Sequence, residues 1–360
     1  MKLIDKYLLR NLMVPLCYCL LAFSMIYIVF DLFDHMSEFV DAKTPLASVV
    51  KFYILLLPSV LIFIAPVSLF LAVLYSLSHL TKNNELTAMR SCGISLLRMM
   101  VPLIAVGLTA SMIVSVIHET IGPWSAYWTD QFVRLQKHKG DLSVHVVSML
   151  GLVNEVKGRD WIVEKFDTRT YEMSNVTLTQ KRDDGTAGRI RARQAHWMDG
   201  RWWFEELVTQ NYDRDGNPMG PPQFELRREM KDVEETPANF INEIKDPEFL
   251  SAREIINFLE THRLSDEKIA QRKVDFHSRL AMPWMCLIVV LLGIPFGAQT
   301  GRRGAFIGIV LALALFFGLY VLVNVGVAFG KKGTIDPWLA GWLPNVFFFC
   351  IGSVMIYRMR

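Results

Sequence analysis

Long uncharged runs dominate the pattern of hydrophobic and polar positions along the chain. Each run is about 20 residues or more, the length that a helix needs to cross a bilayer. Core helices of soluble proteins rarely avoid charge for so long, and the first run is too long for a signal peptide and lacks its cleavage site. The pattern therefore predicts six transmembrane helices. The uncharged runs are Asn11–Phe30, Phe52–Thr81, Met99–His118, Leu280–Gly301, Gly304–Gly330 and Pro337–Tyr357.

Between the third and fourth runs the pattern changes to short β-like segments. From about Gly151 to Met230, six such segments are separated by turn signals such as "KGRD", "RDDG" and "MDGR". This spacing predicts a β-sandwich, a jellyroll or a curved sheet. In one segment the alternation predicts a cationic face opposite a second face. The cationic face would carry Arg189, Arg191 and Arg193, and the other Ile190, Ala192, Gln194 and His196.

The predicted fold class is a membrane α-helical protein with six transmembrane helices and an inserted extracytoplasmic all-β, jellyroll-like domain. Residues 1–130 would hold the first three spans, with a short polar helix at about 83–93. Residues 131–250 would form the β domain. Residues 251–360 would hold an amphipathic linker helix, which begins with capping-box spacing at Ser251 and Glu254, and the last three spans.

The distribution of Lys and Arg in the short loops predicts the orientation, because cytoplasmic loops are enriched in these residues. One side has ten of them and the other has four. Both termini and the polar helix near Asn83 should therefore be cytoplasmic, and the β domain should lie outside. The ten are Lys2, Lys6, Arg10, Lys82, Arg90, Arg98, Arg302, Arg303, Arg358 and Arg360, and the four are Lys43, Lys51, Lys331 and Lys332.

The composition argues against several classes of function. The formal net charge is only +3, with 52% hydrophobic residues, which gives no indication of nucleic-acid binding. The insert contains none of the five cysteines, so it must fold without disulfides. The chain contains no P-loop, no H-E-x-x-H and no G-x-S-x-G motif, and no Asp or Glu deep in a span. We therefore expect no catalytic residues, no metal site and no covalent chemistry in this chain.

The polar segment "NNELTAMRSCGIS" follows the second span. Asn83 or Asn84 can cap a helix, Glu85 suits its N-terminal dipole, and Gly93 can end it in a left-handed conformation. An apolar centre flanked by charges suits either a helix lying on lipid headgroups or a helix docked in the groove of a cytoplasmic partner. The candidate contact residues are Glu85, Leu86, Met89, Arg90 and Gly93.

This segment resembles the cytoplasmic coupling-helix motif of the lipopolysaccharide export permeases, the LptF/LptG (YjgP/YjgQ) family. Three further stretches are similar to the family's last three spans: "FHSRLAMPWMCLIVVLLGIPFG", "GRRGAFIGI" and "DPWLAGWLPN". "IDKYLLRN" is similar to the family's start. The arrangement of three spans, an insert and three spans covers the whole chain.

The resemblance implies the permease subunit of an ABC-type exporter in the inner membrane. Two permeases of this type would pair, and a dimer of a separate ABC ATPase would dock on the coupling helices. That ATPase would hold ATP and Mg, so this chain itself needs no cofactor. The exporter would extract lipopolysaccharide from the membrane and pass it to a periplasmic jellyroll bridge protein. The β domain would then be periplasmic and both termini cytoplasmic.

The resemblance also suggests substrate contacts. Arg134 falls where the family also has an arginine, and with Lys137 and Lys139 it could bind lipid phosphates. The chain departs from the family near the outer end of the first span, where acidic residues replace basic ones. These acids could bridge divalent cations or pair with the partner permease; they are Asp31, Asp34, Glu38 and Asp41.

Large aromatic residues of the insert could relay acyl chains or simply pack in its core; the relay candidates are Trp161, Trp203 and Phe204. A second hypothesis is a membrane-anchored envelope sensor or scaffold whose β domain binds an envelope ligand. A third is an integral-membrane enzyme, such as a lipid transferase. A sensor should carry a cytoplasmic signalling domain, and an enzyme should show a polar catalytic cluster. The sequence shows neither, which favours the transporter permease.

Overall fold

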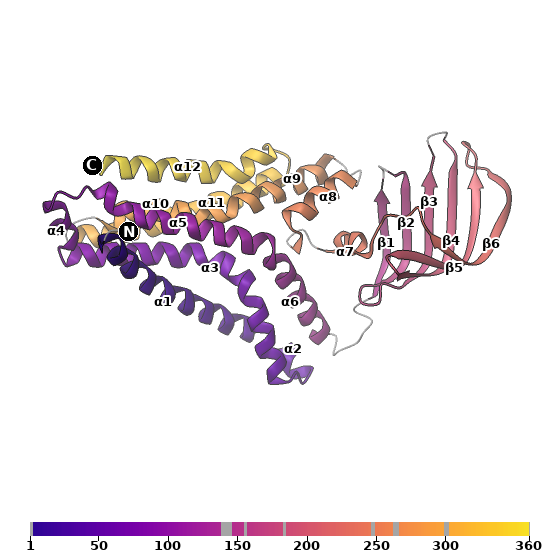
Figure 1. The fold of residues 1–360 in the computed structure, drawn as a ribbon, viewed down its shortest axis with the longest axis horizontal. Helices are drawn as coiled ribbons and strands as arrows, with labels where there is room; N and C mark the ends of the chain where they lie inside the picture. Colours follow the sequence, from indigo (N-terminus) through magenta and orange to yellow (C-terminus); the bar gives the residue numbers. More distant parts are fainter. Residues whose placement is uncertain are drawn as a thin grey trace. The chain divides into compact units, whose positions relative to one another are not determined.

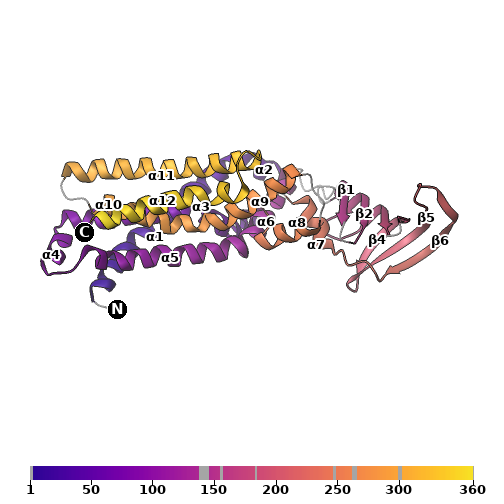
Figure 2. The same cartoon turned by 90° about the horizontal axis from the view of Figure 1, so that it is seen from above.

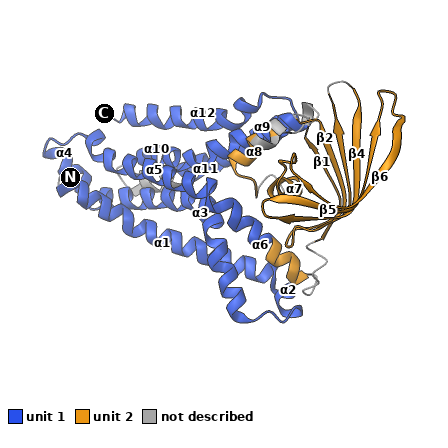
Figure 3. Ribbon diagram, turned by 45° about the vertical axis from the view of Figure 1, so that its right-hand side comes forward, with its two compact units in different colours: residues 1–130, 266–360 blue, residues 131–265 orange. Residues whose placement is uncertain are grey.

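The computed structural model of the protein describes residues 3–137, 146–154, 157–182, 185–245, 249–261, 266–298 and 302–359. The chain divides into two compact units (Figure 3). One is helical and comprises residues 1–130 and 266–360, and the other comprises residues 131–265 and contains the β-sheet.

Within the described residues, six helical segments of the first unit are long and apolar enough to cross a membrane, as predicted. The fourth is interrupted by the 3-10 turn η3 (Met282–Trp284), where Pro283 has no backbone N–H to donate. The segments are α1 (Leu3–Asp34), α3 (Leu46–Lys82), α5 (Leu96–Glu119), α9 (Asp266–Ala281) continuing through η3 into α10 (Met285–Gly297), α11 (Arg302–Lys331) and α12 (Pro337–Arg358).

The fourth span forms the centre of the helical unit. Every residue of α10 except Leu287 is buried, and α10 packs against α3, α5, α11 and α12. Figure 2 shows α12 running along α9, and Gly341 permits this contact: a Cβ there would come within 2.8 Å of the His277 carbonyl carbon. By contrast, α1 and α11 bury only 11% of their most apolar windows, so their apolar side chains face outward from the unit.

Three short helices complete this part of the chain: α2 (Met36–Asp41), α4 (Glu85–Ser91) and α6 (Ile121–Lys137). The first of them follows the end of α1. The helix α4 lies at the end of the bundle where both chain ends are found (Figures 1 and 2). The start of α6 is held against α3, because the Ser59 hydroxyl donates to the Gly122 carbonyl at 3.1 Å.

The second unit contains one antiparallel sheet of six strands in consecutive order (Figure 1). Each strand therefore pairs only with its neighbours in sequence, and the six predicted strands and the fold class are confirmed. The strands are β1 (Val146–Asn154), β2 (Arg159–Asp167), β3 (Met173–Lys181), β4 (Ala187–Met198), β5 (Arg201–Tyr212) and β6 (Pro218–Met230).

A row of irregular positions crosses all six strands and shifts the alternation of inward and outward side chains. In this row Met149, Asn175 and Glu206 have positive φ angles of 57°, 52° and 49°. Such irregularities bend a strand and increase its twist. The row consists of Met149, Glu164, Asn175, Arg193, Glu206 and Leu226, which are the positions skipped in the pairing of neighbouring strands.

The shift corrects one prediction for β4. Ala192 and Ala195 are both buried, although they lie three positions apart and only two residues separate them. Gln194 and His196 therefore lie on the same exposed face as Arg193, and His196 approaches the Glu205 carboxylate at 3.9 Å on that face. The predicted alternation holds up to Arg193 and was wrong beyond it.

One face of the sheet packs against α7 (Pro237–Ile244), and α8 (Ala252–Thr261) follows. Phe240 of α7 is fully buried, with its ring centroid 5.2 Å from that of Trp161 and 5.7 Å from that of Trp202. The predicted capping box of α8 is present: Ser251 N donates to Glu254 Oε2 at 2.7 Å, and Glu254 N donates to Ser251 Oγ at 3.2 Å.

A buried ion pair closes one end of this core. Arg159 Nη1 lies 2.9 Å from Glu235 Oε2, and both side chains are almost fully buried. Asn154 Nδ2 donates to Glu235 Oε1 at 2.6 Å, and Trp202 Nε1 donates to the Glu235 backbone carbonyl at 2.6 Å. Glu235 therefore links β1, β2 and β5 to the segment that leads into α7.

Candidate functional site

The helix α4 is the candidate site that the sequence defines best, and its end forms as predicted. Gly93 has φ +82°, which an L-residue with a side chain rarely adopts. Gly93 N donates to Arg90 O at 2.9 Å and Ile94 N donates to Met89 O at 3.3 Å, which is the Schellman pattern of a helix stop. The start differs from the prediction, because Asn84 is left-handed and its side chain makes no capping hydrogen bond.

The orientation of α4 corrects the expected contact surface. Leu86 is only 4% exposed and belongs to the core of the helical unit, and Met89 is half-buried against that core. These two residues therefore anchor α4 to the bundle and do not form the exposed apolar centre expected from the sequence. The side chains of α4 that face away from the bundle are those of Thr87, Ala88, Arg90 and Ser91.

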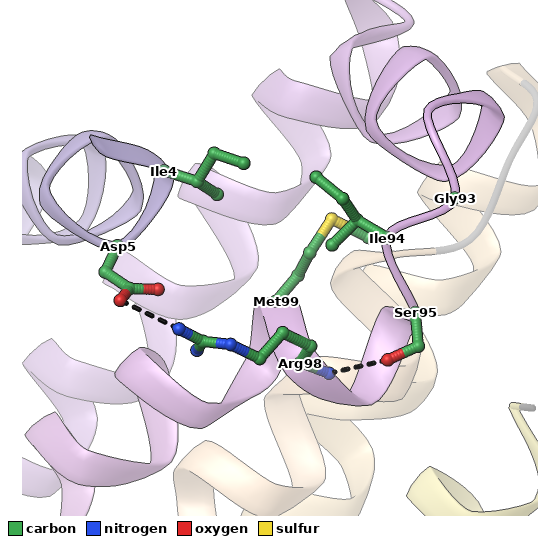
Figure 4. Close-up of a pocket in the computed structure, with 7 residues that line it drawn as sticks. All are labelled: Ile4, Asp5, Gly93, Ile94, Ser95, Arg98 and Met99. Atoms are coloured by element: carbon green, nitrogen blue, oxygen red, sulfur yellow. Dashed lines mark hydrogen bonds and ion pairs between the residues drawn. The ribbon is translucent and has the colours of Figure 1, made fainter. Parts of the chain in front are cut away.

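Two polar contacts tie α4 and the start of α5 to the first turns of α1. The Tyr7 hydroxyl donates to Glu85 Oε2 at 2.6 Å, and Arg98 Nη2 donates to Asp5 Oδ2 at 2.9 Å. Ser95 caps α5 by accepting from the Arg98 backbone N–H at 3.3 Å (Figure 4). In the sequence, "IDKYLLRN" is recognisable only by its similarity to the family's start, and these partners were not predicted.

A cavity of about 490 Å³ lies between the first turn of α1 and the start of α5. Figure 4 shows the Asp5 carboxylate and the Arg98 guanidinium meeting at its edge. The side chain of Ile4 and the linker from Gly93 to Ser95 line other parts of its wall. The arrangement leaves open space beside a polar contact at the surface of the bundle.

At the opposite end of α1, the four acidic residues do not form one cluster with a shared ligand geometry. His35 Nδ1 lies 3.6 Å from Asp31 Oδ2, and Ser37 Oγ donates to Glu38 Oε2 at 3.2 Å. Asp34 and Asp41 are exposed. Throughout the described ranges, no group of three or more His, Cys, Asp or Glu side chains could hold a metal ion.

The predicted phosphate contacts fall on and after α6. Arg134 and Lys137 are both exposed and lie three residues apart, which places them on one side of the helix. Lys139 lies outside the described residues. Earlier in the same helix, the Trp128 ring forms a cation–π contact with Lys51, whose Nζ lies 5.8 Å from the ring centroid.

The three aromatic relay candidates are not brought together. Trp161 and Phe204 are fully buried in the core of the sheet, with ring centroids 5.8 Å apart. Trp203 lies on the other face, where the Arg227 guanidinium stacks 4.6 Å from its ring centroid. Ordinary core packing therefore accounts for Trp161 and Phe204 in this conformation.

The short helix α4 lies between the second and third spans, in a layout of three spans, a β insert and three spans. The family model "Lipopolysaccharide export system permease LptF/LptG" matches residues 6–358. The chain belongs to the LptF/LptG family. Relatives named lipopolysaccharide export system permease protein LptF, from Escherichia coli K12 and from Shigella flexneri, are each 20% identical to it. Each alignment covers 98% of this chain and 94% of the relative.

The structure shows what the LptF/LptG-like residues of the second half do. Arg279 Nη2 donates to the His118 carbonyl at 2.7 Å, and Asn345 Nδ2 donates to the Ala281 carbonyl at 2.6 Å. Asn345 is buried, so its bond to a backbone carbonyl satisfies a donor that has no access to water. These residues hold the fourth span against the end of the third span and against the interior of the sixth, which is a structural role.

Proposed function

We propose that this chain is the permease subunit of an ABC-type exporter. It would extract lipopolysaccharide from the inner membrane and pass it to a periplasmic bridge. The match to the LptF/LptG family over residues 6–358 carries this proposal. The names of the relatives describe lipopolysaccharide export, and the layout of six spans and a β insert suits that task.

A separate ABC ATPase dimer docks on α4 and supplies ATP hydrolysis, with ATP and Mg bound in that partner. The outward face of α4 offers small side chains and one cation at Arg90, which suits a shallow fit into a groove of another protein. Leu86 and Met89 act as anchors to the bundle, so a force applied to α4 reaches the spans. Gly93 fixes where the helix ends.

The excess of basic residues at the α4 end supports a cytoplasmic position for that end. Both termini are then cytoplasmic, and the β domain is periplasmic. The protein is a multi-pass protein of the inner membrane in this arrangement.

A second LptF/LptG-type permease pairs with this chain through part of the apolar surface of α1 and α11. Both helices expose large apolar residues along their length, among them Tyr18, Leu21 and Phe317. Lipid covers some of this surface, and a partner span covers the rest, because van der Waals packing drives the association of helices in a bilayer.

The edges of the β domain suit pairing with the jellyroll bridge protein. In the described sheet β1 and β6 are the edge strands. The nine residues of β1 include no charged residue and no proline, which are the usual means of blocking an exposed edge. A strand of the bridge can extend such an edge through main-chain hydrogen bonds.

Arg134 and Lys137 bind the phosphates of the lipid headgroup, because guanidinium and ammonium groups form charge-assisted hydrogen bonds with phosphate oxygens. Replacing Arg134 by Glu should therefore reduce the lipopolysaccharide that copurifies with the assembled exporter. Arg191→Glu, at an exposed arginine of β4, is the matched control and should leave the lipid content unchanged. Equal lipid content in the two variants would exclude Arg134 as a contact.

The decisive experiment is an affinity purification of this chain from its own membranes in mild detergent, with mass spectrometry of proteins and lipids. The proposal expects a small P-loop ATPase, a second six-span permease and a lipid-A-bearing glycolipid. Glu85→Ala or Arg90→Ala should remove the ATPase from the purified complex. Lys332→Ala is the control, because Lys332 is exposed and follows the C-terminal end of α11; this variant should retain the ATPase. A chain that purifies alone, with phospholipid only, would instead support an envelope sensor or scaffold.

A further inference from the structure

Two contacts join the beginning of the chain to residues far along the sequence. Tyr7 reaches Glu85, 78 residues away, and Asp5 reaches Arg98, 93 residues away. Glu85 begins α4, and Arg98 lies in the first turn of α5. The first turns of α1 therefore contact both helices that flank the Gly93 linker.

Both contacts are hydrogen bonds to a carboxylate, and their strength depends on the angle at the donor and the acceptor. Each one involves a carboxylate, and hydrogen bonds of this kind are stronger than neutral ones and weaken steeply when the geometry is lost. The carboxylate of Asp5 is mostly buried, with 14% of its side chain exposed, whereas 42% of the Arg98 side chain is exposed. The contacts can therefore form and break at the surface without disrupting the apolar core.

The cavity beside them makes the polar contacts important for this link. It separates the first turn of α1 from the linker at Gly93 and Ile94 (Figure 4). In this first turn Ile4 packs only partly against the core, and full burial of α1 begins at Leu8 and Leu12. A displacement of α4 would therefore reach the start of α1 through Tyr7 and Asp5.

The helix α1 is suited to receive such a displacement. It is one continuous helix of 32 residues, and only 11% of its most apolar window is buried within this chain. It packs along α3 and α5, but most of its surface contacts no other part of the described chain. Such a helix can tilt more easily than α10, in which every residue except Leu287 is buried. A small movement at its first turn would be passed to the acidic residues at its other end.

We propose that Asp5 and Tyr7 are positioning residues that transmit the movement of α4 to α1 during transport. This inference rests on the proposed function, in which the ATPase docks on α4. The hydroxyl of Tyr7 follows Glu85, and the carboxylate of Asp5 follows Arg98, so α1 moves with the α4–α5 corner. Loss of either contact uncouples ATP hydrolysis from lipid movement.

The test uses the exporter purified with its ATPase and reconstituted in vesicles that contain lipopolysaccharide. ATP hydrolysis and lipid release are measured for Tyr7→Phe, Asp5→Asn, Asp5→Arg, Arg98→Asp and the double variant Asp5→Arg/Arg98→Asp. We expect hydrolysis within about twofold of wild type. Lipid released per ATP should fall by about tenfold in Tyr7→Phe and in each charge reversal, which is the range expected when a hydrogen bond to a charged group is lost.

The double charge reversal separates coupling from simple damage, because it restores an ion pair with its polarity exchanged. It should recover lipid release per ATP to within about threefold of wild type. Tyr75→Phe removes a hydroxyl from an exposed tyrosine of α3 and is the matched control. It should behave as wild type.

Two results would overturn the inference. One is wild-type lipid release per ATP in Tyr7→Phe and in both single charge reversals. The other is a double reversal that releases no more lipid per ATP than either single reversal. This result counts against the inference if Asp5→Asn is well folded, because removing the charge of Asp5 then does not by itself unfold the protein. Both leave the proposed function intact if the ATPase still copurifies. Absence of the ATPase from the wild-type preparation would instead refute the proposed function.

Discussion

Replacing Glu235 by glutamine should destabilise the β domain more than any comparable change at its surface. The substitution preserves shape but removes the charge that faces Arg159, whose guanidinium is buried with it. Asn154 also loses its charged acceptor. Trp202 keeps its bond to the backbone carbonyl of residue 235, so that contact is unaffected.

The expected magnitude follows from the burial of the pair. Removing one partner of a buried ion pair typically costs about 3–5 kcal/mol, because the remaining charge is left uncompensated. Arg159 keeps one hydrogen bond, from Nη2 to the Asp232 carbonyl, which favours the lower end of that range. A loss of about 3 kcal/mol corresponds to about a hundredfold rise in the population of the opened state.

The assay is hydrogen exchange with mass spectrometry on the full-length chain in lipid nanodiscs. Peptides from β1, β2 and α7 should lose protection, and peptides from α10 should serve as an internal reference. Glu234→Gln is the matched control. Glu234 is the neighbour of Glu235 in sequence, but its side chain is 71% exposed and forms a surface ion pair with Lys157. That change should cost less than about 0.5 kcal/mol.

A rescue variant tests the reasoning further. Arg159→Met combined with Glu235→Leu removes both charges and should recover most of the loss, because apolar pairs often replace buried ion pairs without penalty. The reasoning would be refuted if Glu235→Gln raised exchange by less than about threefold. It would also be refuted if the two glutamine variants behaved alike.

Three further outcomes are expected. A membrane-impermeant maleimide should label Cys92, exposed at the end of α4, in inverted vesicles but not in intact cells. Gly341→Val should lower the thermal midpoint through overpacking of about 1–3 kcal/mol, whereas Gly318→Ala should not, because its Cβ would lie 3.9 Å from the nearest atom. Hydrogen bonds from Arg228 hold the pKa of Glu225 below its usual 4.5, so acidification below about pH 4.5 should loosen β6.

Each outcome has a clear contrary result. Labelling of Cys92 from outside intact cells would reverse the proposed orientation. Equal midpoints for the two glycine variants would mean that α12 is not closely packed at Gly341. For Glu225, a lowered folded pKa means that the stabilisation is present above the unfolded pKa and is lost as the pH falls through the folded pKa. Arg228→Gln should therefore flatten that pH dependence, and an unchanged profile would assign it to other groups.

The spans and the end of α4 could be predicted because both depend on local properties. Avoidance of charge over about 20 residues is visible in any window, and a glycine after a short helix is a local stop signal. The inward orientation of Leu86 could not be predicted in the same way. Leu86 and Met89 share one side of α4, and the sequence does not show whether that side contacts the bundle or a partner protein.

The β domain shows a second limit of sequence patterns. The positive φ angles at Met149 and Glu206 have no local signal, since Asn is the usual residue there and only Asn175 provides it. The shift in the alternation of inward and outward side chains of β4 was therefore not predicted. The buried ion pair of Arg159 and Glu235 was not predicted either. The separation of Trp203 from Phe204, however, follows from the two-residue period of a strand and could have been predicted.

The consecutive strand order has a consequence for biosynthesis. Every strand pairs with the one synthesised just before or after it, so the sheet needs no partner from the later spans. Such local topologies fold quickly, and chains emerge at about 5–20 residues per second. Phe240 and Glu235, which complete the core, are made before the fourth span begins at Lys268. The β domain can therefore fold while the second half of the bundle is still being synthesised.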